Sequence, residues 1–127
     1  MGGIYYERAE TAGVTTETDI KNEIMLAVSR GGTRLLRNNC GRFQDKRGKW
    51  VAFGVGNPGG SDLIGWTTMT LMGEPVAVFT AIEVKRPGEY TTDDQERFIH
   101  TVREAGGIAG IAASPDDALN LISNYLR

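Results

Sequence analysis

Two charged residues end a segment that otherwise has the composition of a buried β-strand. Residues 76–85 read V-A-V-F-T-A-I-E-V-K, so the segment is apolar until Glu83 and Lys85. Such an apolar run is typical of a central strand covered on both faces. Because side chains alternate along a strand, Glu83 and Lys85 point to the same side. They form either an ordinary salt bridge at the end of the strand or part of a catalytic site.

A second carboxylate is expected near this pair. Asp62 follows the turn N-P-G-G-S at residues 57–61 and opens the preceding predicted strand, so it could lie near Glu83 across a hairpin. Two close carboxylates raise each other's pKa unless a cation neutralises them, and a hard divalent ion with oxygen ligands is the usual partner. The alternative is that Asp62 is only a turn residue.

Two polar residues on predicted helices could join the same cluster. Gln95 lies inside the apolar face of a helix that starts at Thr92, so it points inward. As the third residue after Thr92 it could equally close a capping box. Glu23 borders the apolar face of the predicted first helix and either reaches the cluster or is solvated.

Positive charge is concentrated in one segment. The formal net charge is −2, which argues against an electrostatic grip of the whole protein on nucleic acid. Half of the 14 Lys and Arg residues nevertheless lie before Trp50 in one stretch, against the single acid Asp45: Arg30, Arg34, Arg37, Arg42, Lys46, Arg47 and Lys49. This stretch either faces a polyanion or forms a solvated hairpin with a basic tip.

Length and composition exclude several classes of protein. The 127 residues fit one domain, residues 1–127. One cysteine, Cys40, excludes an internal disulfide, and one histidine, His100, excludes His-rich zinc or triad chemistry. Cys40 is interpreted as a buried thiol or a loop residue, and His100 as exposed. No apolar run reaches the roughly 20 residues of a membrane span, and no signal peptide is evident, so a soluble cytoplasmic protein is expected.

The glycines at residues 54–59 match G-x-G-x-x-G, the dinucleotide-binding fingerprint. That motif requires a following helix, whereas a strand is predicted here and Pro58 interrupts the pattern, so a Rossmann fold is rejected. These glycines are expected instead to form a tight turn that positions Asp62 and brings backbone amides close to a group such as phosphate.

The predicted elements define an α/β fold. A capped helix, a strand-rich region, a second helix, a short strand and a third helix follow one another. Because a helical crossover returns parallel, the result is a mixed sheet, an antiparallel meander plus one parallel strand, flanked by helices. The helices are expected at 16–31, 92–105 and from 114 onwards, and the strands at 33–39, 50–55, 62–71, 75–85 and 108–113.

Together these motifs resemble the virus-type replication-repair nuclease (VRR-NUC) family of the PD-(D/E)XK nucleases. The resemblance covers residues 16–126, and its specific parts are S-D at 61–62, E-V-K at 83–85 and Gln95, with Glu23 before them and G-G-I-A-G at 106–110 after them. Ser61 stands where the name of the superfamily has proline. The resemblance implies a restriction-endonuclease-like core.

The resemblance also implies roles for the site residues. Asp62 and Glu83 would bind Mg²⁺ or Mn²⁺, with the backbone carbonyl of Val84 as a third ligand and Glu23 acting through water or a second ion. Such an ion lowers the pKa of bound water and offsets charge in the transition state. Lys85 would activate the attacking water or stabilise developing charge, and Gln95 would position Lys85 or the water.

The implied function is a structure-selective DNA endonuclease. The family's small members resemble four-way (Holliday) junction resolvases, which act as homodimers, and the basic stretch would contact phosphates of branched DNA. Such an enzyme belongs to the cytoplasm of a bacterium or of a phage-infected cell. The alternatives are a monomeric flap or single-strand nuclease and a non-enzymatic DNA-binding module.

Overall fold

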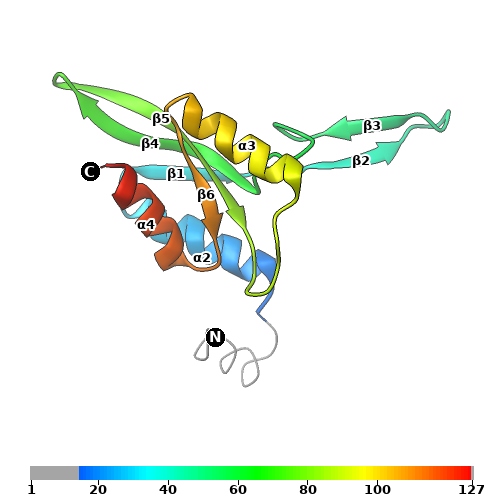
Figure 1. The fold of residues 1–127 in the computed structure, drawn as a ribbon, viewed down its shortest axis with the longest axis horizontal. Coiled ribbons are helices and arrows are strands. Elements are labelled where there is room, and N and C mark those ends of the chain that lie inside the picture. Colours follow the sequence, from blue (N-terminus) through cyan, green and yellow to red (C-terminus); the bar gives the residue numbers. More distant parts are fainter. Residues whose placement is uncertain (1–14, 127) are drawn as a thin grey trace.

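The computed structural model describes residues 15–126, so residues 1–14 and 127 of the predicted single domain lie outside the described part. A four-stranded sheet has the order β1-β4-β5-β6, in which only β6 runs parallel to its neighbour. The mixed sheet with flanking helices is therefore confirmed (Figure 1). The elements are α2 (Glu17–Ser29), β1 (Thr33–Arg37), β2 (Gly41–Gln44), β3 (Trp50–Phe53), β4 (Leu63–Leu71), β5 (Glu74–Val84), α3 (Asp93–Glu104), β6 (Ile108–Ala112) and α4 (Pro115–Tyr125).

Each helix begins directly after an N-cap residue whose side chain accepts a hydrogen bond from a backbone N–H of the first turn. A capping box between Thr16 and Asp19 opens α2, and the predicted box between Thr92 and Gln95 opens α3. Ser114 caps α4, with Pro115 at its first position. No helix among residues 15–126 is both long and apolar enough to cross a membrane.

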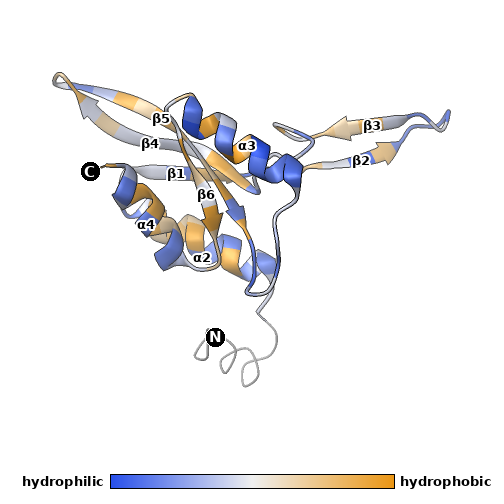
Figure 2. Cartoon of the chain, in the orientation of Figure 1, coloured by the Kyte–Doolittle hydropathy of each residue, from blue (hydrophilic) through white to orange (hydrophobic). Residues whose placement is uncertain are grey.

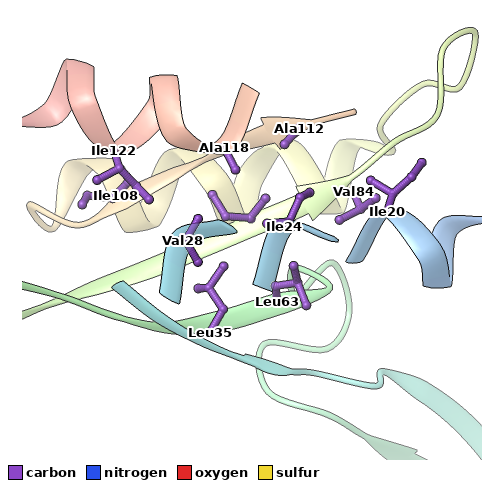
Figure 3. Packing of buried hydrophobic residues seen from close by; sticks show 11 residues of the cluster. Ile20, Ile24, Val28, Leu35, Leu63, Val84, Ile108, Ala112, Ala118 and Ile122 are labelled. Atoms are coloured by element: carbon purple, nitrogen blue, oxygen red, sulfur yellow. The ribbon is translucent and has the colours of Figure 1, made fainter. Parts of the chain in front are cut away.

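Helices cover both faces of the sheet. The larger core lies under α2 and α4, where Ile20, Ile24 and Val28 of α2 pack on Leu63 and Ile82 of the sheet (Figure 3). The smaller core lies on the other face, under α3. In Figure 2 the side of α3 that faces away from the sheet is largely hydrophilic, as expected for a helix with one buried stripe.

The predicted meander needs one correction. Trp50–Phe53 does not join the main sheet but pairs with Gly41–Gln44, a strand that the sequence analysis missed, in a separate hairpin that projects from the body (Figure 1). The turn is closed locally, because the Asp45 carboxylate accepts hydrogen bonds from the N–H groups of Arg47 and Lys49 at 2.8 and 2.9 Å. Adjacent segments with such a short connection pair with each other rather than with β1.

The expectation that β5 is covered on both faces holds only for its second half. Residues 80–84 are buried, whereas most of the first half is exposed and Phe79 is 42% exposed. The cause is length: β4 and β5 have 9 and 11 residues, whereas β1 and β6 have 5 each, so the far end of the β4–β5 hairpin extends past its neighbours (Figure 1).

Candidate functional site

The buried end of β5 carries the charged pair to the α3 side of the sheet. Glu83 lies on the same side of the strand as Ala81, which packs in the core under α3. Only 2% of the surface of Glu83 is exposed. The Glu83 Oε2 atom lies 3.4 Å from the Lys85 Nζ and accepts a 3.1 Å hydrogen bond from the Gln95 Nε2. The end of β5 and helix α3 thus bring Lys85 and Gln95 to the same carboxylate oxygen of Glu83.

Asp62 lies beside them, immediately before β4. Its Oδ2 accepts a 2.8 Å hydrogen bond from the Val84 N–H, and its Oδ1 lies 3.5 Å from the Lys21 Nζ. The pairing of Leu63 with Ile82 brings Asp62 to the end of β5 that carries Glu83. Asp62 therefore interacts with Glu83 across the hairpin. It also contacts the backbone of Val84, the expected carbonyl ligand, through the N–H of that residue.

The Glu83 carboxyl group is held in an unfavourable place for a negative charge. Burial and then the nearby charge of Asp62 raise its pKa from 4.5 to about 7, and Lys85 partly opposes the increase. Its Oε1 is buried and has no hydrogen-bond partner among residues 15–126. A buried carboxylate with an unsatisfied oxygen beside a second carboxylate fits a divalent cation.

The ligands available to such a cation are few. Within residues 15–126 no group of three or more His, Cys, Asp or Glu side chains could hold a metal ion together. Two carboxylates, a backbone carbonyl and water would complete the set. Such a set of oxygen ligands suits a hard divalent cation.

Gln95 fulfils both roles that the sequence analysis left open. Its Oε1 accepts a 2.9 Å hydrogen bond from the Thr92 N–H and closes the capping box, while its Nε2 donates to Glu83. The amide has a donor end and an acceptor end, so the two roles do not compete. The start of α3 is thereby tied to the carboxylate.

Glu23 is not brought into this cluster by the structure. It is exposed, and among the described residues it has no hydrogen bond or ion pair with Asp62 or Glu83. Another acid of α2, Glu17, interacts electrostatically with the site. Burial and the charges of Glu89 and Asp62 raise the pKa of Glu17.

A helical wheel separates Glu17 from Glu23. Glu17 lies on the line of Ile20 and Ile24, the buried stripe of α2, whereas Glu23 lies about 120° from Glu17 around the helix. An acid in the first turn is usually explained by the helix dipole, which hid this position.

The seven basic residues are divided between two places. Arg42, Lys46, Arg47 and Lys49 are exposed on the β2–β3 hairpin, in agreement with a basic-tipped hairpin. The others serve the body of the protein: Arg30 is the C-cap of α2, Arg34 donates to the carbonyls of Ser29, Gly31 and Thr33, and Arg37 donates to Asn22.

The glycine-rich turn, His100 and Cys40 lie outside the carboxylate cluster. A strand follows the glycines of residues 54–59, as predicted, and a side chain at Gly56 or Gly59 would collide with Phe98 or the backbone of Asp94. The close approach that these glycines permit is therefore to the start of α3. His100 is exposed as predicted, and Cys40 is an exposed loop residue rather than a buried thiol.

The raised pKa of Glu83 predicts a stability profile for the metal-free protein. Since the folded-state pKa, about 7, lies above 4.5, the folded state holds a proton that the unfolded state loses between these values. Stability from this group is complete below about pH 4.5 and is lost as the pH rises through 7. Glu83→Gln is expected to remove this loss, which amounts to about 3 kcal/mol.

Urea unfolding at pH 5 and pH 8 in EDTA measures this effect as the difference between the two proteins. Comparison with the variant cancels the opposite pH dependence of Asp19 and Glu89, whose pKa values are lowered by hydrogen bonds to Thr16 and Arg86. If the free energy of unfolding depended on pH equally in both proteins, the pKa of Glu83 would not be raised by folding.

Comparison with known proteins agrees with this geometry. The profile of the VRR-NUC domain matches residues 17–116, most of the chain. Searches of the curated proteins and of the solved structures give no significant match. The matched span contains Asp62, Glu83, Lys85 and Gln95, and its mixed sheet flanked by helices is consistent with the PD-(D/E)XK nucleases. The chain belongs to the VRR-NUC family.

Proposed function

We propose that this protein, a nuclease-type domain by its family, is a Mg²⁺- or Mn²⁺-dependent endonuclease that hydrolyses phosphodiester bonds in branched DNA. One observation carries the proposal: Glu83 is buried with one oxygen held by Lys85 and Gln95 and the other without a partner, next to Asp62. A buried carboxylate oxygen without a partner is costly, and a bound cation would offset that cost.

Asp62 and Glu83, with the Val84 carbonyl, would hold the cation. When bound, a divalent ion of this kind lowers the pKa of water and offsets negative charge at a phosphate. The N–H of Val84 fixes the Asp62 carboxylate at 2.8 Å, so one ligand is already oriented by the end of the strand. Gln95 orients the other ligand through its amide.

Lys85 supplies the remaining chemistry. Its ammonium group lies 3.4 Å from Glu83 and is only 17% exposed, so it is held beside the carboxylate rather than extended into solvent. In this place it can hold an attacking water or stabilise charge on the scissile phosphate. Gln95 limits the movement of Glu83 and, through it, that of Lys85.

The proposed substrate and assembly rest on the exposed basic side chains and on the resemblance to junction resolvases. The exposed Arg and Lys side chains of the β2–β3 hairpin contact phosphates. Contacts with phosphates position DNA without reading its sequence. A four-way junction is resolved by two incisions and needs two active sites, so we propose a homodimer with one site in each chain.

A panel of labelled substrates tests this function. Purified protein is incubated with a four-way junction, a flap, a duplex and single-stranded DNA in Mg²⁺, Mn²⁺ or EDTA, and its mass is measured by light scattering. Paired, metal-dependent incisions of the junction by a dimer are expected. Metal-dependent cutting of flaps or single strands by a monomer would replace the substrate, and binding without cutting in either metal would indicate a DNA-binding module.

A further inference from the structure

The β2–β3 hairpin has large apolar side chains that no second layer covers in the part of the chain that the structure describes. From the register, Gly41, Phe43, Val51 and Phe53 share one face, and Arg42 and Trp50 lie on the other. Phe43, Trp50 and Phe53 are 50%, 55% and 44% exposed. Large exposed aromatic groups on a projecting element are typical of a binding surface.

The aromatic groups are arranged for contact. The rings of Phe43 and Phe53 lie 6.2 Å apart, and the guanidinium carbon of Arg42 lies 4.9 Å from the Trp50 ring centroid. A side chain at Gly41 would collide with the Phe53 ring, so this glycine makes room for the ring to lie across the strand. Each face of the hairpin therefore presents a flat apolar group.

Charge identifies the class of partner. The hairpin carries Arg42, Lys46, Arg47 and Lys49 against one acid, and that acid, Asp45, is engaged by backbone N–H groups in the turn. A positively charged surface with flat aromatic groups matches a nucleic acid. The phosphates of a nucleic acid pair with the Arg and Lys side chains, and its nucleobases stack on the aromatic rings. In an intact duplex the base faces are hidden, and they become available where stacking is interrupted.

The base of the hairpin is fixed to the candidate site. The Asn57 amide donates to the carbonyls of Gly41 and Phe53, each at 2.8 Å. Asn38, which is buried, donates to the carbonyls of Val55 and Ser61, and its own N–H donates to the Asp62 carbonyl at 2.8 Å. A ligand on the hairpin is thus held at a defined distance from Asp62.

We propose that the β2–β3 hairpin is a stacking wedge that recognises DNA branch points through Phe43, Phe53 and Trp50. This inference rests on the proposed function, because it names the structural feature by which that site selects its DNA. The wedge selects unstacked bases, and the basic residues at its tip add affinity for any DNA.

The test measures binding separately from cleavage. Anisotropy with a labelled four-way junction and a duplex of equal length is recorded in Ca²⁺ without turnover. Phe43→Ser/Phe53→Ser and, on the other face, Trp50→Ala are expected to weaken junction binding by at least about fivefold and to leave duplex binding within twofold. Leu71→Ser, at the tip of the other hairpin and 62% exposed, is the matched control and is expected to bind both as wild type.

A fluorescent base reports stacking directly. 2-Aminopurine at the branch point is expected to change its fluorescence on binding wild type and Leu71→Ser, and to change less with the hairpin variants. Thermal unfolding near the wild-type temperature shows that the variants are folded, since the three aromatic groups lie outside both cores.

The possible results separate the two proposals. Hairpin-dependent junction binding without cutting in Mg²⁺ or Mn²⁺ supports the wedge and rejects the endonuclease. Cutting that is insensitive to the hairpin variants, equal loss on junction and duplex, or absence of DNA binding by wild type rejects the wedge. A change from dimer to monomer in the variants also rejects it, because the aromatic groups would then contact a second copy.

Discussion

Replacing Asp62 with Asn or Glu83 with Gln is expected to lower the rate of cleavage by about 10³-fold or more. Each change keeps the shape of the side chain but removes a negative charge that the cation needs, and metal-dependent stabilisation of a phosphate is worth several kcal/mol. Junction binding in Ca²⁺ is expected to stay within a few fold, because the basic hairpin lies outside the carboxylate cluster. Single-turnover cleavage with Mg²⁺ measures the effect.

Metal binding gives an independent readout for the same variants. Calorimetric titration with Mn²⁺ is expected to show binding to wild type and none, or very weak binding, to Glu83→Gln. Glu96→Gln is the matched control, because Glu96 is an exposed acid one residue from Gln95. Cleavage by either site variant at a tenth of the wild-type rate or more would contradict the assignment of these ligands.

The same assays decide between the acids of α2. Glu17 lies on the buried stripe near Asp62, and Glu23 is the position implied by the family resemblance. If an acid of α2 assists the cation through water, the placement of these side chains predicts a larger loss for Glu17→Gln than for Glu23→Gln. The reverse order would favour the assignment from the resemblance.

The fold was predictable where one local pattern determined the structure. The helical spacing after Thr16, the capping box at Thr92 and the alternation along residues 76–85 depend only on near neighbours. The helices and the sides of the strand therefore followed from the sequence. Glu83 and Lys85 had to share a side, and Gln95 had to face the sheet, before any contact between them was known.

The path of the chain between β1 and β4 could not be predicted in the same way. Residues 50–55 have the composition of a sheet strand, and composition does not show which strand is the partner. The hairpin leaves the main sheet because Asp45 closes a local turn and because Asn38 and Asn57 hold its base. These are side-chain-to-backbone contacts, several of them between residues far apart in the sequence, and no local pattern shows their partners.

The place of the acids of α2 relative to the site depends on packing rather than on a local pattern. A helical wheel places Glu17 correctly, but an acid in a first turn already has an explanation in the helix dipole. Only the packing of α2 on the end of β5, with Lys21 against Asp62, shows that this turn borders the site. Local rules therefore gave the residue types of the site, and tertiary packing places Glu17, rather than the exposed Glu23, within the electrostatic influence of Asp62.

Lys85→Met is expected to lower cleavage by about 10² to 10⁴-fold while Mn²⁺ binding is kept. Lys21→Met is the matched comparison, because the two lysines have side chains equally exposed at 17% and each contacts one site carboxylate, at 3.4 Å from Glu83 and 3.5 Å from Asp62. Lys21 lies on α2 and balances charge, so a much smaller loss is expected for its variant.

The pH dependence of the Lys85 variant separates a direct role from an indirect one. Lys85 lowers the pKa of Glu83, so its removal moves that pKa further above about 7. If Lys85 acted only by keeping Glu83 ionised, the variant would recover near wild-type cleavage at pH 9, where Glu83 loses its proton without help. A loss that persists at pH 9 is the expected result, because the ammonium group itself then holds the water or the phosphate, and full recovery would assign Lys85 to charge balance alone.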